Sequence, residues 1–394
     1  MSNQSDLEDS ISDDEFYLAQ DEQSNCWQEE VGGETVMVLA HQYQSPYPPL
    51  EEAVKAILSS RDPIYKKTTD KSGREVHAVT ALSYFAWRMP QFIALYSPKI
   101  RHSPHIQLFF DTVKKLDMWL ETFKVPGAWS LVEGKKVAER LNEMVDEIRR
   151  EAATVAFKKS VTRRQENSTK KFQSSRQYVN RIFAWRNRLE VIRVDLEYRT
   201  DKEEPSLAQA RSDLAHFMEN RRHNRLFDDI GGYIWSLEYG GRGRGYHFHV
   251  IFFFDGSKVQ KDTYIARKIG EYWVDVVTKG RGAYYNCNGN KKRYQRLNRL
   301  GIGRIESDDE QKRHNLDHVV QYLTKKDYCL MPEFDGGRVF GKGKSPRINT
   351  LGVGRPRKDR STAENLHLDQ PHLSASANAN AGSPWRIPPT AVAG

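Results

Sequence analysis

The sequence predicts an α+β fold in which a central antiparallel sheet with flanking helices follows a helical N-terminal region. Three observations carry this prediction. Apolar residues recur at helical spacing as far as about residue 165. Polar and apolar residues then alternate in "EVIRVDLEY" (190–198), and two further strand-like runs, 232–239 and 246–254, flank the loop "GGRGRG". Two strands joined by so short a loop pair as an antiparallel hairpin.

Composition divides the chain into four segments. Residues 1–42 are acidic and rich in Ser, Asp and Gln, which predicts a disordered tail. Residues 43–165 form the helical N-terminal region, and 170–347 form the α+β domain. Residues 351–394 are rich in Ala, Ser, Asn and Pro and predict a second disordered tail.

The individual helices follow from apolar spacing and from their start signals. "SPYPPLEEAVKAILSS" predicts a helix that begins just after its prolines, and 133–160 predicts one long amphipathic helix. In the α+β domain, helical patterns occupy 206–224, 262–280 and 314–330.

The strand 190–198 has an apolar side and a charged side. Its apolar residues are Ile192, Val194 and Leu196, and the charged residues on the other side are Arg193, Asp195 and Glu197. We interpret Asp195 and Glu197 as surface charge of the strand, with an approach of either residue to a site as the alternative.

Charge is distributed unevenly along the chain. Residues 1–54 hold 13 of the 52 acidic residues and none of the 61 basic ones, so the remainder carries a formal charge of +22. A basic body of this kind favours a polyanionic partner, most often nucleic acid. The three cysteines form no zinc or disulfide pattern, the N-terminus is too acidic for a signal peptide, and no apolar run could span a membrane. We therefore expect a protein of the reducing cytoplasm with no membrane partner.

The hairpin carries a candidate metal site. His247 and His249 point to the same side of their strand, and if Tyr239 pairs with Tyr246, then Glu238 lies opposite His247 on that side. Two imidazoles and one carboxylate can hold a divalent ion, Mn²⁺ or Mg²⁺, and leave positions open for substrate oxygens. A register shift of one residue would turn Glu238 away, and the histidines would then be ordinary strand residues.

A candidate nucleophile follows on the helix 314–330. Leu316, Val319, Val320 and Leu323 form its apolar stripe, whereas His318, Tyr322 and Lys325 lie on nearly the opposite side. A phenol of ordinary pKa near 10 becomes a useful nucleophile when a metal polarises the phosphate and a cation stabilises the phenolate. Lys325 can supply that cation or hold the phosphodiester. Tyr328 points elsewhere on the helical wheel, which favours a single-tyrosine enzyme.

These motifs resemble the HUH endonucleases. The strand motif is His247-Phe248-His249, and the helix motif Tyr-x-x-Lys is Tyr322-Leu323-Thr324-Lys325. "RVDLEY", "WSLEYGGRGRGYHFHV" and "YLTKKD" are similar in order and spacing to the replication initiators of inovirus (filamentous-phage) type and their prophage relatives. The resemblance covers about 185–345.

The resemblance implies a function. In that superfamily, the histidines and a nearby acidic or polar residue bind Mg²⁺ or Mn²⁺. The tyrosine attacks a DNA phosphate and forms a 5′-phosphotyrosine, and the free 3′-OH primes rolling-circle replication. The expected partner is single-stranded or locally melted DNA at a replication origin in a bacterial host, with host helicase and polymerase as further candidates. The resemblance also implies helices on one face of the sheet and the catalytic surface on the other.

Basic segments supply candidate DNA contacts. Arg242 and Arg244 lie in the glycine-rich hairpin loop, and 281–304 holds seven Arg or Lys, no acid and three tyrosines. We expect this segment to be a DNA-contacting insertion, with a solvated basic loop as the alternative. Its candidate residues are Lys291, Lys292, Arg293, Tyr294 and Arg296. Residues 158–176 are equally basic, but a linker is an equal alternative there, and "GRPRK" (354–358) resembles the core of an AT-hook.

Other functions remain open from the sequence. A transposase or a relaxase could use the same chemistry on a different DNA substrate. The chain shows no helicase-type phosphate loop, which argues against a large relaxase. A non-catalytic DNA-binding regulator could share the same basic surface.

Overall fold

The computed structural model describes residues 26–31, 34–39, 47–97, 100–119, 135–239, 245–296, 298–325, 331–332 and 337–346. The chain divides into two units, Met1–Ile348 and Asn349–Gly394, and every described residue belongs to the first. The predicted tail 351–394 and most of 1–42 lie outside the described residues. Within the N-terminal segment, β1 (Cys26–Val31) and β2 (Glu34–Leu39) form an antiparallel hairpin where the sequence had predicted disorder.

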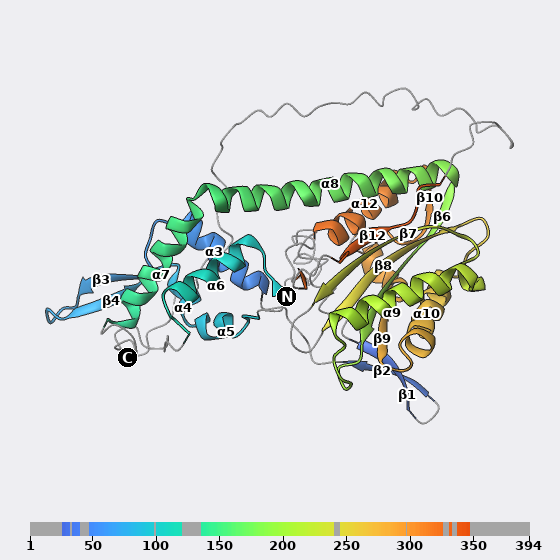
Figure 1. The fold of residues 1–394 in the computed structure, drawn as a ribbon. Coiled ribbons are helices and arrows are strands. Elements are labelled where there is room, and N and C mark those ends of the chain that lie inside the picture. Colours follow the sequence, from blue (N-terminus) through green and yellow to red (C-terminus); the bar gives the residue numbers. More distant parts are fainter. Residues whose placement is uncertain are drawn as a thin grey trace, which may run out of the picture. The chain divides into compact units, whose positions relative to one another are not determined.

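The N-terminal region is helical, as predicted (Figure 1). Its helices are α3 (Tyr47–Ser59), α4 (Ser83–Ala86), α5 (Met89–Ile93), α6 (Pro104–Lys115) and α7 (Val137–Ala152). The sequence did not predict the hairpin of β3 (Tyr65–Thr69) and β4 (Glu75–Val79), nor the short strand β5 (Ile100–Arg101). Helix α6 shows why such helices begin where they do: the Ser103 hydroxyl accepts from the Ile106 amide, and Pro104 occupies the first turn.

The long helix predicted over 133–160 is in fact two helices. Helix α7 ends at Ala152, and α8 (Val155–Trp185) begins anew because the Thr154 side chain accepts a hydrogen bond from the Phe157 amide. Helix α8 then continues without a break across 166–169, the boundary expected between the two regions. Residues 158–176, for which a linker was an equal alternative, are therefore part of one continuous helix.

The second region is built on a six-stranded antiparallel sheet of order β10-β6-β8-β7-β12, with β9 also paired to β6. Its strands are β6 (Arg188–Tyr198), β7 (Ile230–Tyr239), β8 (Tyr246–Asp255), β9 (Gly282–Asn286), β10 (Gly303–Glu306) and β12 (Phe340–Lys342). Its helices are α9 (Leu207–Asn220), α10 (Asp262–Tyr272), α11 (Lys291–Arg296) and α12 (Glu310–Lys325). A π-turn, Trp273–Val277, extends α10, and β11 (Met331–Pro332) pairs with β5. The predicted α+β class and the predicted strands are confirmed.

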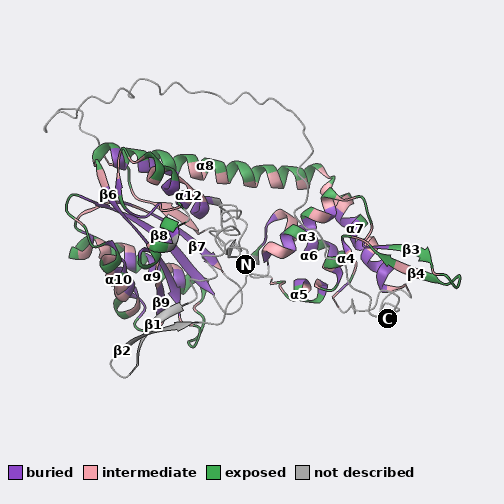
Figure 2. Cartoon of the chain, turned by 180° about the vertical axis from the view of Figure 1, so that it is seen from behind, coloured by how far each residue is buried: buried purple, intermediate pink, exposed green. Residues whose placement is uncertain are grey.

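Helices cover both faces of this sheet, which corrects the expectation of one open face. Side chains of α8 and α12 pack on one face, against residues that include Val191, Ile251 and Phe253. Side chains of α9, α10 and the π-turn pack on the other, against residues that include Val194, Phe248 and Phe252. Figure 2 shows the resulting burial of the strands. Because β6 is covered on both sides, the interpretation of Asp195 and Glu197 as surface charge is wrong: these two residues, and Arg193 on the same side, are at most 6 % exposed.

One edge of β6 is completed by three pieces of chain. Strand β10 pairs with Arg188–Val191, and β9 pairs with Val194–Tyr198. Between them the buried side chain of Asn288 takes the place of a strand: its Oδ1 accepts from the Arg193 amide at 2.9 Å, and its Nδ2 donates to the Val191 carbonyl at 3.0 Å. The two ends of the segment 281–304 are thus strands of the sheet, and the 3-10 turn Cys287–Asn290 and α11 lie between them. This corrects the prediction of the whole segment as an insertion or a loop.

Within the described residues, no helix is long and apolar enough to cross a membrane.

Candidate metal and tyrosine site

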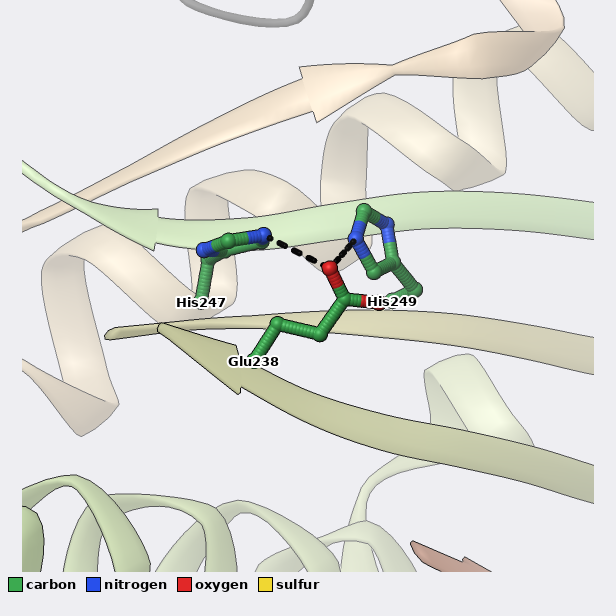
Figure 3. Close-up of side chains that lie close together, drawn as sticks. All are labelled: Glu238, His247 and His249. Atoms are coloured by element: carbon green, nitrogen blue, oxygen red, sulfur yellow. Dashed lines mark ion pairs between the residues drawn. The ribbon is translucent and has the colours of Figure 1, made fainter. Parts of the chain in front are cut away.

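The β7–β8 hairpin has the predicted register. Glu238 lies opposite His247, Tyr239 lies opposite Tyr246, and Ser236 lies opposite His249. The side chains of Glu238, His247 and His249 therefore project from the same face of the sheet and converge (Figure 3). All three are buried, and one ligand atom from each lies within 4.8 Å of the other two.

The three side chains present their donor atoms toward one another. Oε2 of Glu238 lies 3.4 Å from Nε2 of His247 and 3.4 Å from Nε2 of His249. Nδ1 of His247 lies 3.2 Å from the Gly245 carbonyl, which can only accept, so Nδ1 carries a proton. Both Nε2 atoms thus face the carboxylate rather than the backbone.

His249 is oriented by a buried ion pair of Asp195 and Arg193. The approach of Asp195 to the site was the alternative that the sequence left open, whereas its pairing with Arg193 was not predicted. Nδ1 of His249 lies 2.8 Å from Oδ1 of Asp195, which lies opposite His249 on β6. Arg193 donates from Nε and Nη2 to the two oxygens of Asp195, each at 3.2 Å. A carboxylate behind a metal-binding imidazole fixes the ring's tautomer and raises its basicity, as in many metalloproteins.

Electrostatics keeps both carboxylates of the site ionised. Burial by itself would raise the pKa of Asp195, but Arg193 and His249 outweigh burial and hold that pKa well below its ordinary value. Burial likewise opposes ionisation of Glu238, and the two facing histidines lower its pKa below the usual range. An ionised carboxylate is the form that binds a cation.

Tyr322 lies beside this cluster. Its ring centre is 6.2 Å from that of His249, and the guanidinium carbon of Arg193 lies 5.4 Å from the centre of the Tyr322 ring. Tyr322 is 5 % exposed and belongs to the same buried cluster as the apolar stripe of α12. The expectation that it lies on nearly the opposite side from the buried residues is therefore wrong, because the side of α12 that carries Tyr322 is buried as well. Lys325 is the last residue of α12, and its side chain lies outside the described part of the structure.

The candidate DNA contacts lie in several environments. Arg242 and Arg244 and the side chain of Arg293 lie outside the described residues. Lys292 and Arg296 are exposed on α11, and Lys291 is half-buried, with its Nζ 2.5 Å from Oδ2 of Asp262.

Tyr294 is 3 % exposed and belongs to the core beneath α12. Such a ring does not fit the expected role of stacking on a DNA base, because a stacking ring must present a face to the ligand.

The residues present fit a divalent cation. Two ligand atoms that each lie about 2.1 Å from an ion, with a right angle between their bonds to it, are about 3 Å apart. This is close to the observed 3.4 Å separations. Two imidazoles and one carboxylate suit Mn²⁺, and the same donor set also occurs with Fe²⁺. Glu238, His247 and His249 would be the protein ligands.

The fold and the site together define an α+β domain whose sheet carries a buried two-histidine, one-carboxylate cluster beside a tyrosine. Residues 150–343 match the family model described as the YagK/YfjJ C-terminal domain, a family of prophage-type proteins in bacteria. The matched segment contains the triad and Tyr322, and the match supports the prophage relationship in this coarse form. No curated protein and no solved structure matches the chain.

Proposed function

We propose that this protein is a metal-dependent, site-specific DNA nickase and strand-transferase that initiates rolling-circle replication of a phage or prophage. The observation that carries the proposal is the position of Tyr322 against His249 of the buried Glu238–His247–His249 cluster. A tyrosine beside a site that can hold a divalent cation is an arrangement that can support phosphoryl transfer to a protein nucleophile. The basic charge of the chain outside its N-terminal segment supports a nucleic-acid substrate.

The proposed reaction conserves the phosphodiester bond energy. The Tyr322 oxygen attacks phosphorus in line with the departing 3′ oxygen, so a P–O(Tyr) bond forms as the P–O3′ bond breaks. The phenol loses one proton and the 3′ oxygen gains one, which leaves a 5′-phosphotyrosine and a free 3′-OH. Attack by a 3′-OH on the phosphotyrosine reverses these changes and rejoins DNA without ATP.

The side chains have separate roles in this scheme. Glu238, His247 and His249 would hold Mn²⁺ or Mg²⁺, which when bound supplies Lewis-acid polarisation of the scissile phosphate. Asp195 holds the His249 ring in position, and Arg193 places a positive charge beside Tyr322. Lys325, one turn after Tyr322 on α12, is proposed to neutralise the phosphodiester.

The test is a covalent adduct on a denaturing gel. Purified full-length protein is incubated with Mn²⁺ and labelled single-stranded fragments that tile the DNA of the candidate origin. A metal-dependent protein–DNA band is expected for the wild type and is expected to be absent for Tyr322→Phe and for Glu238→Gln. Tyr264→Phe is the matched control, because Tyr264 is 48 % exposed on α10, and it should give the wild-type band.

The rival functions predict other outcomes. A transposase or a relaxase gives the same adduct, but on a hairpin end or a transfer origin, so the sequence of the cleaved fragment separates them. A non-catalytic DNA-binding regulator binds the fragments and forms no adduct with either metal. That last result would refute the proposed nicking activity.

A further inference from the structure

Helix α8 has two sides of different character. In its C-terminal half, Ser175, Tyr178, Val179, Ile182 and Phe183 are buried. The N-terminal half has no buried residue, as the exposed colouring of α8 in Figure 2 shows. Two side-chain contacts join α8 to α12. The Ser168 hydroxyl donates to the Thr324 carbonyl at 3.2 Å, and Arg176 forms an ion pair with Asp317 at 2.8 Å.

The outer side of α8 carries a line of positive charge. At 100° per residue, Lys159, Arg163, Lys170 and Arg181 fall within an arc of about 40°, roughly opposite the buried residues. All four are exposed. We call these four residues the basic stripe.

Little negative charge balances the basic stripe. Residues 155–185 contain eight Lys or Arg and one acid, Glu166, whose carboxylate lies 3.9 Å from Nζ of Lys170. Lys159, Arg163 and Arg181 have no ion pair with any other residue that the structure describes. On α7, by contrast, each of Arg140, Arg149 and Arg150 pairs with an acidic residue three positions earlier or later.

An ordinary solvated helix mixes charges of both signs, because like charges on one face destabilise the helix. In the basic stripe, Lys159 and Arg163 lie one turn apart and retain that repulsion. A polyanion on this face would remove the repulsion and release counterions.

The dimensions and chemistry of the stripe select duplex DNA among polyanions. From Lys159 to Arg181 the helix rises about 33 Å, close to the roughly 34 Å of one B-DNA turn. The exposed positions between the charges along this side include Asn167 and Gln177, which can donate to phosphates, and Glu166, whose carboxylate lies beside Lys170. No aromatic or apolar side chain lies within the stripe, so it lacks both the stacking groups of a single-strand site and the apolar face of a membrane-surface helix.

We propose that the outer face of α8 binds the phosphate backbone of duplex DNA, independently of base sequence, through Lys159, Arg163, Lys170 and Arg181. This surface is distinct from the triad, and the inference does not depend on the nicking chemistry.

The experiment measures the binding of the full-length protein to a duplex of about 25 base pairs and arbitrary sequence, by fluorescence anisotropy, across about 50–200 mM salt. The stripe variant combines Lys159→Gln, Arg163→Gln, Lys170→Gln and Arg181→Gln. The control variant removes the same number of exposed charges elsewhere: Arg61→Gln, Lys71→Gln, Lys202→Gln and Arg225→Gln. Circular dichroism establishes that both variants keep the wild-type helix content.

The salt dependence gives a quantitative expectation. Each lost duplex phosphate contact lowers the slope of log K against log[salt] by about 0.9, so the stripe variant should lose about 3 to 4 from the slope. The control variant should lose less than about 1 from the slope.

Equal slopes for the two variants would overturn the proposal, and so would a larger loss on single-stranded DNA than on duplex. Binding of the wild type to anionic vesicles that the stripe variant alone loses, with duplex binding unchanged, would assign the face to a membrane instead. Because binding is the readout, these outcomes are the same whether or not the protein cleaves DNA.

Discussion

The guanidinium carbon of Arg193 lies 5.4 Å from the centre of the Tyr322 ring, and two nitrogens of the same group bond Asp195 at 3.2 Å. Asp195 in turn contacts Nδ1 of His249 at 2.8 Å. One buried cation therefore connects the proposed nucleophile with the carboxylate that orients a metal ligand. The position of Tyr322 and the orientation of His249 depend on the same side chain.

Substitution of Arg193→Lys should slow adduct formation at least about 10-fold while changing Mn²⁺ affinity less than about 3-fold. Lysine keeps the charge beside Asp195 but lacks the planar fork that also packs against the Tyr322 ring. Single-turnover gel assays and calorimetric Mn²⁺ titration measure the two quantities. Arg199→Lys is the matched control, because Arg199 makes the same kind of forked pair with Asp201, at 2.9 and 2.8 Å, away from the site. Equal loss of rate in both variants would contradict a specific role for Arg193.

Substitution of Asp195→Asn should, by contrast, weaken the binding of Mn²⁺. Without the carboxylate behind it, His249 loses its fixed tautomer, and we expect Mn²⁺ affinity to fall about 10- to 100-fold. Calorimetry on the apoprotein measures this directly and needs no DNA. Asp201→Asn, at an exposed position, should bind Mn²⁺ as the wild type does. Unchanged affinity in Asp195→Asn would show that the ion pair does not support a metal site.

Glu190 should make stability depend on pH. Burial, and then the nearby Asp262, raise the pKa of Glu190 to about 7, against the opposing charges of Arg304 and Lys291. A folded pKa above the unfolded value means that the stabilising contribution is complete below about pH 4.5 and is lost as the pH rises through about 7.

Substitution of Glu190→Gln should remove that loss. We expect the free energy of unfolding of the variant, relative to wild type, to improve by about 1–3 kcal/mol between pH 5 and pH 8. Urea unfolding at the two pH values measures this difference. Glu203→Gln, at an exposed position, serves as the control. Parallel pH profiles for wild type and Glu190→Gln would refute the prediction.

Substitution of Gly301→Ala should displace α12. A Cβ atom at position 301 would lie 2.5 Å from the backbone carbonyl of Asn315, so helix and loop could not keep their present separation. We expect a loss of about 1–3 kcal/mol in the free energy of unfolding and reduced adduct formation, because α12 carries Tyr322. Gly289→Ala is the control, since its nearest neighbour would be 3.9 Å away. Equal melting temperatures for Gly301→Ala and Gly289→Ala would argue against this close contact between position 301 and α12.

Sequence reasoning located the triad because hairpin register and strand alternation are local properties. The short connection between β7 and β8 fixed Glu238 opposite His247, and alternation placed His249 on the same side. The helices and long strands of the second region were predictable for the same reason, since each carries its own periodicity.

The environment of each face was not predictable, because it depends on what packs there. Alternation in β6 separated Arg193 and Asp195 from the apolar residues but could not tell that α12 covers their side as well. The helical wheel likewise placed Tyr322 away from the apolar stripe, although a neighbouring sheet and α8 bury a wider arc of α12. Strands β9 and β10 were missed because they are only five and four residues long and pair with a strand more than eighty residues earlier in the chain.

Asn288 has a consequence for the continuity of the sheet. Strands β9 and β10 leave a gap at Arg193, and the amide side chain of Asn288 fills it from within the fold. A buried amide or carbonyl without a partner costs about 1–3 kcal/mol. One side chain thus stands in for the backbone of a strand, and without it two backbone groups of β6 would lose these bonds.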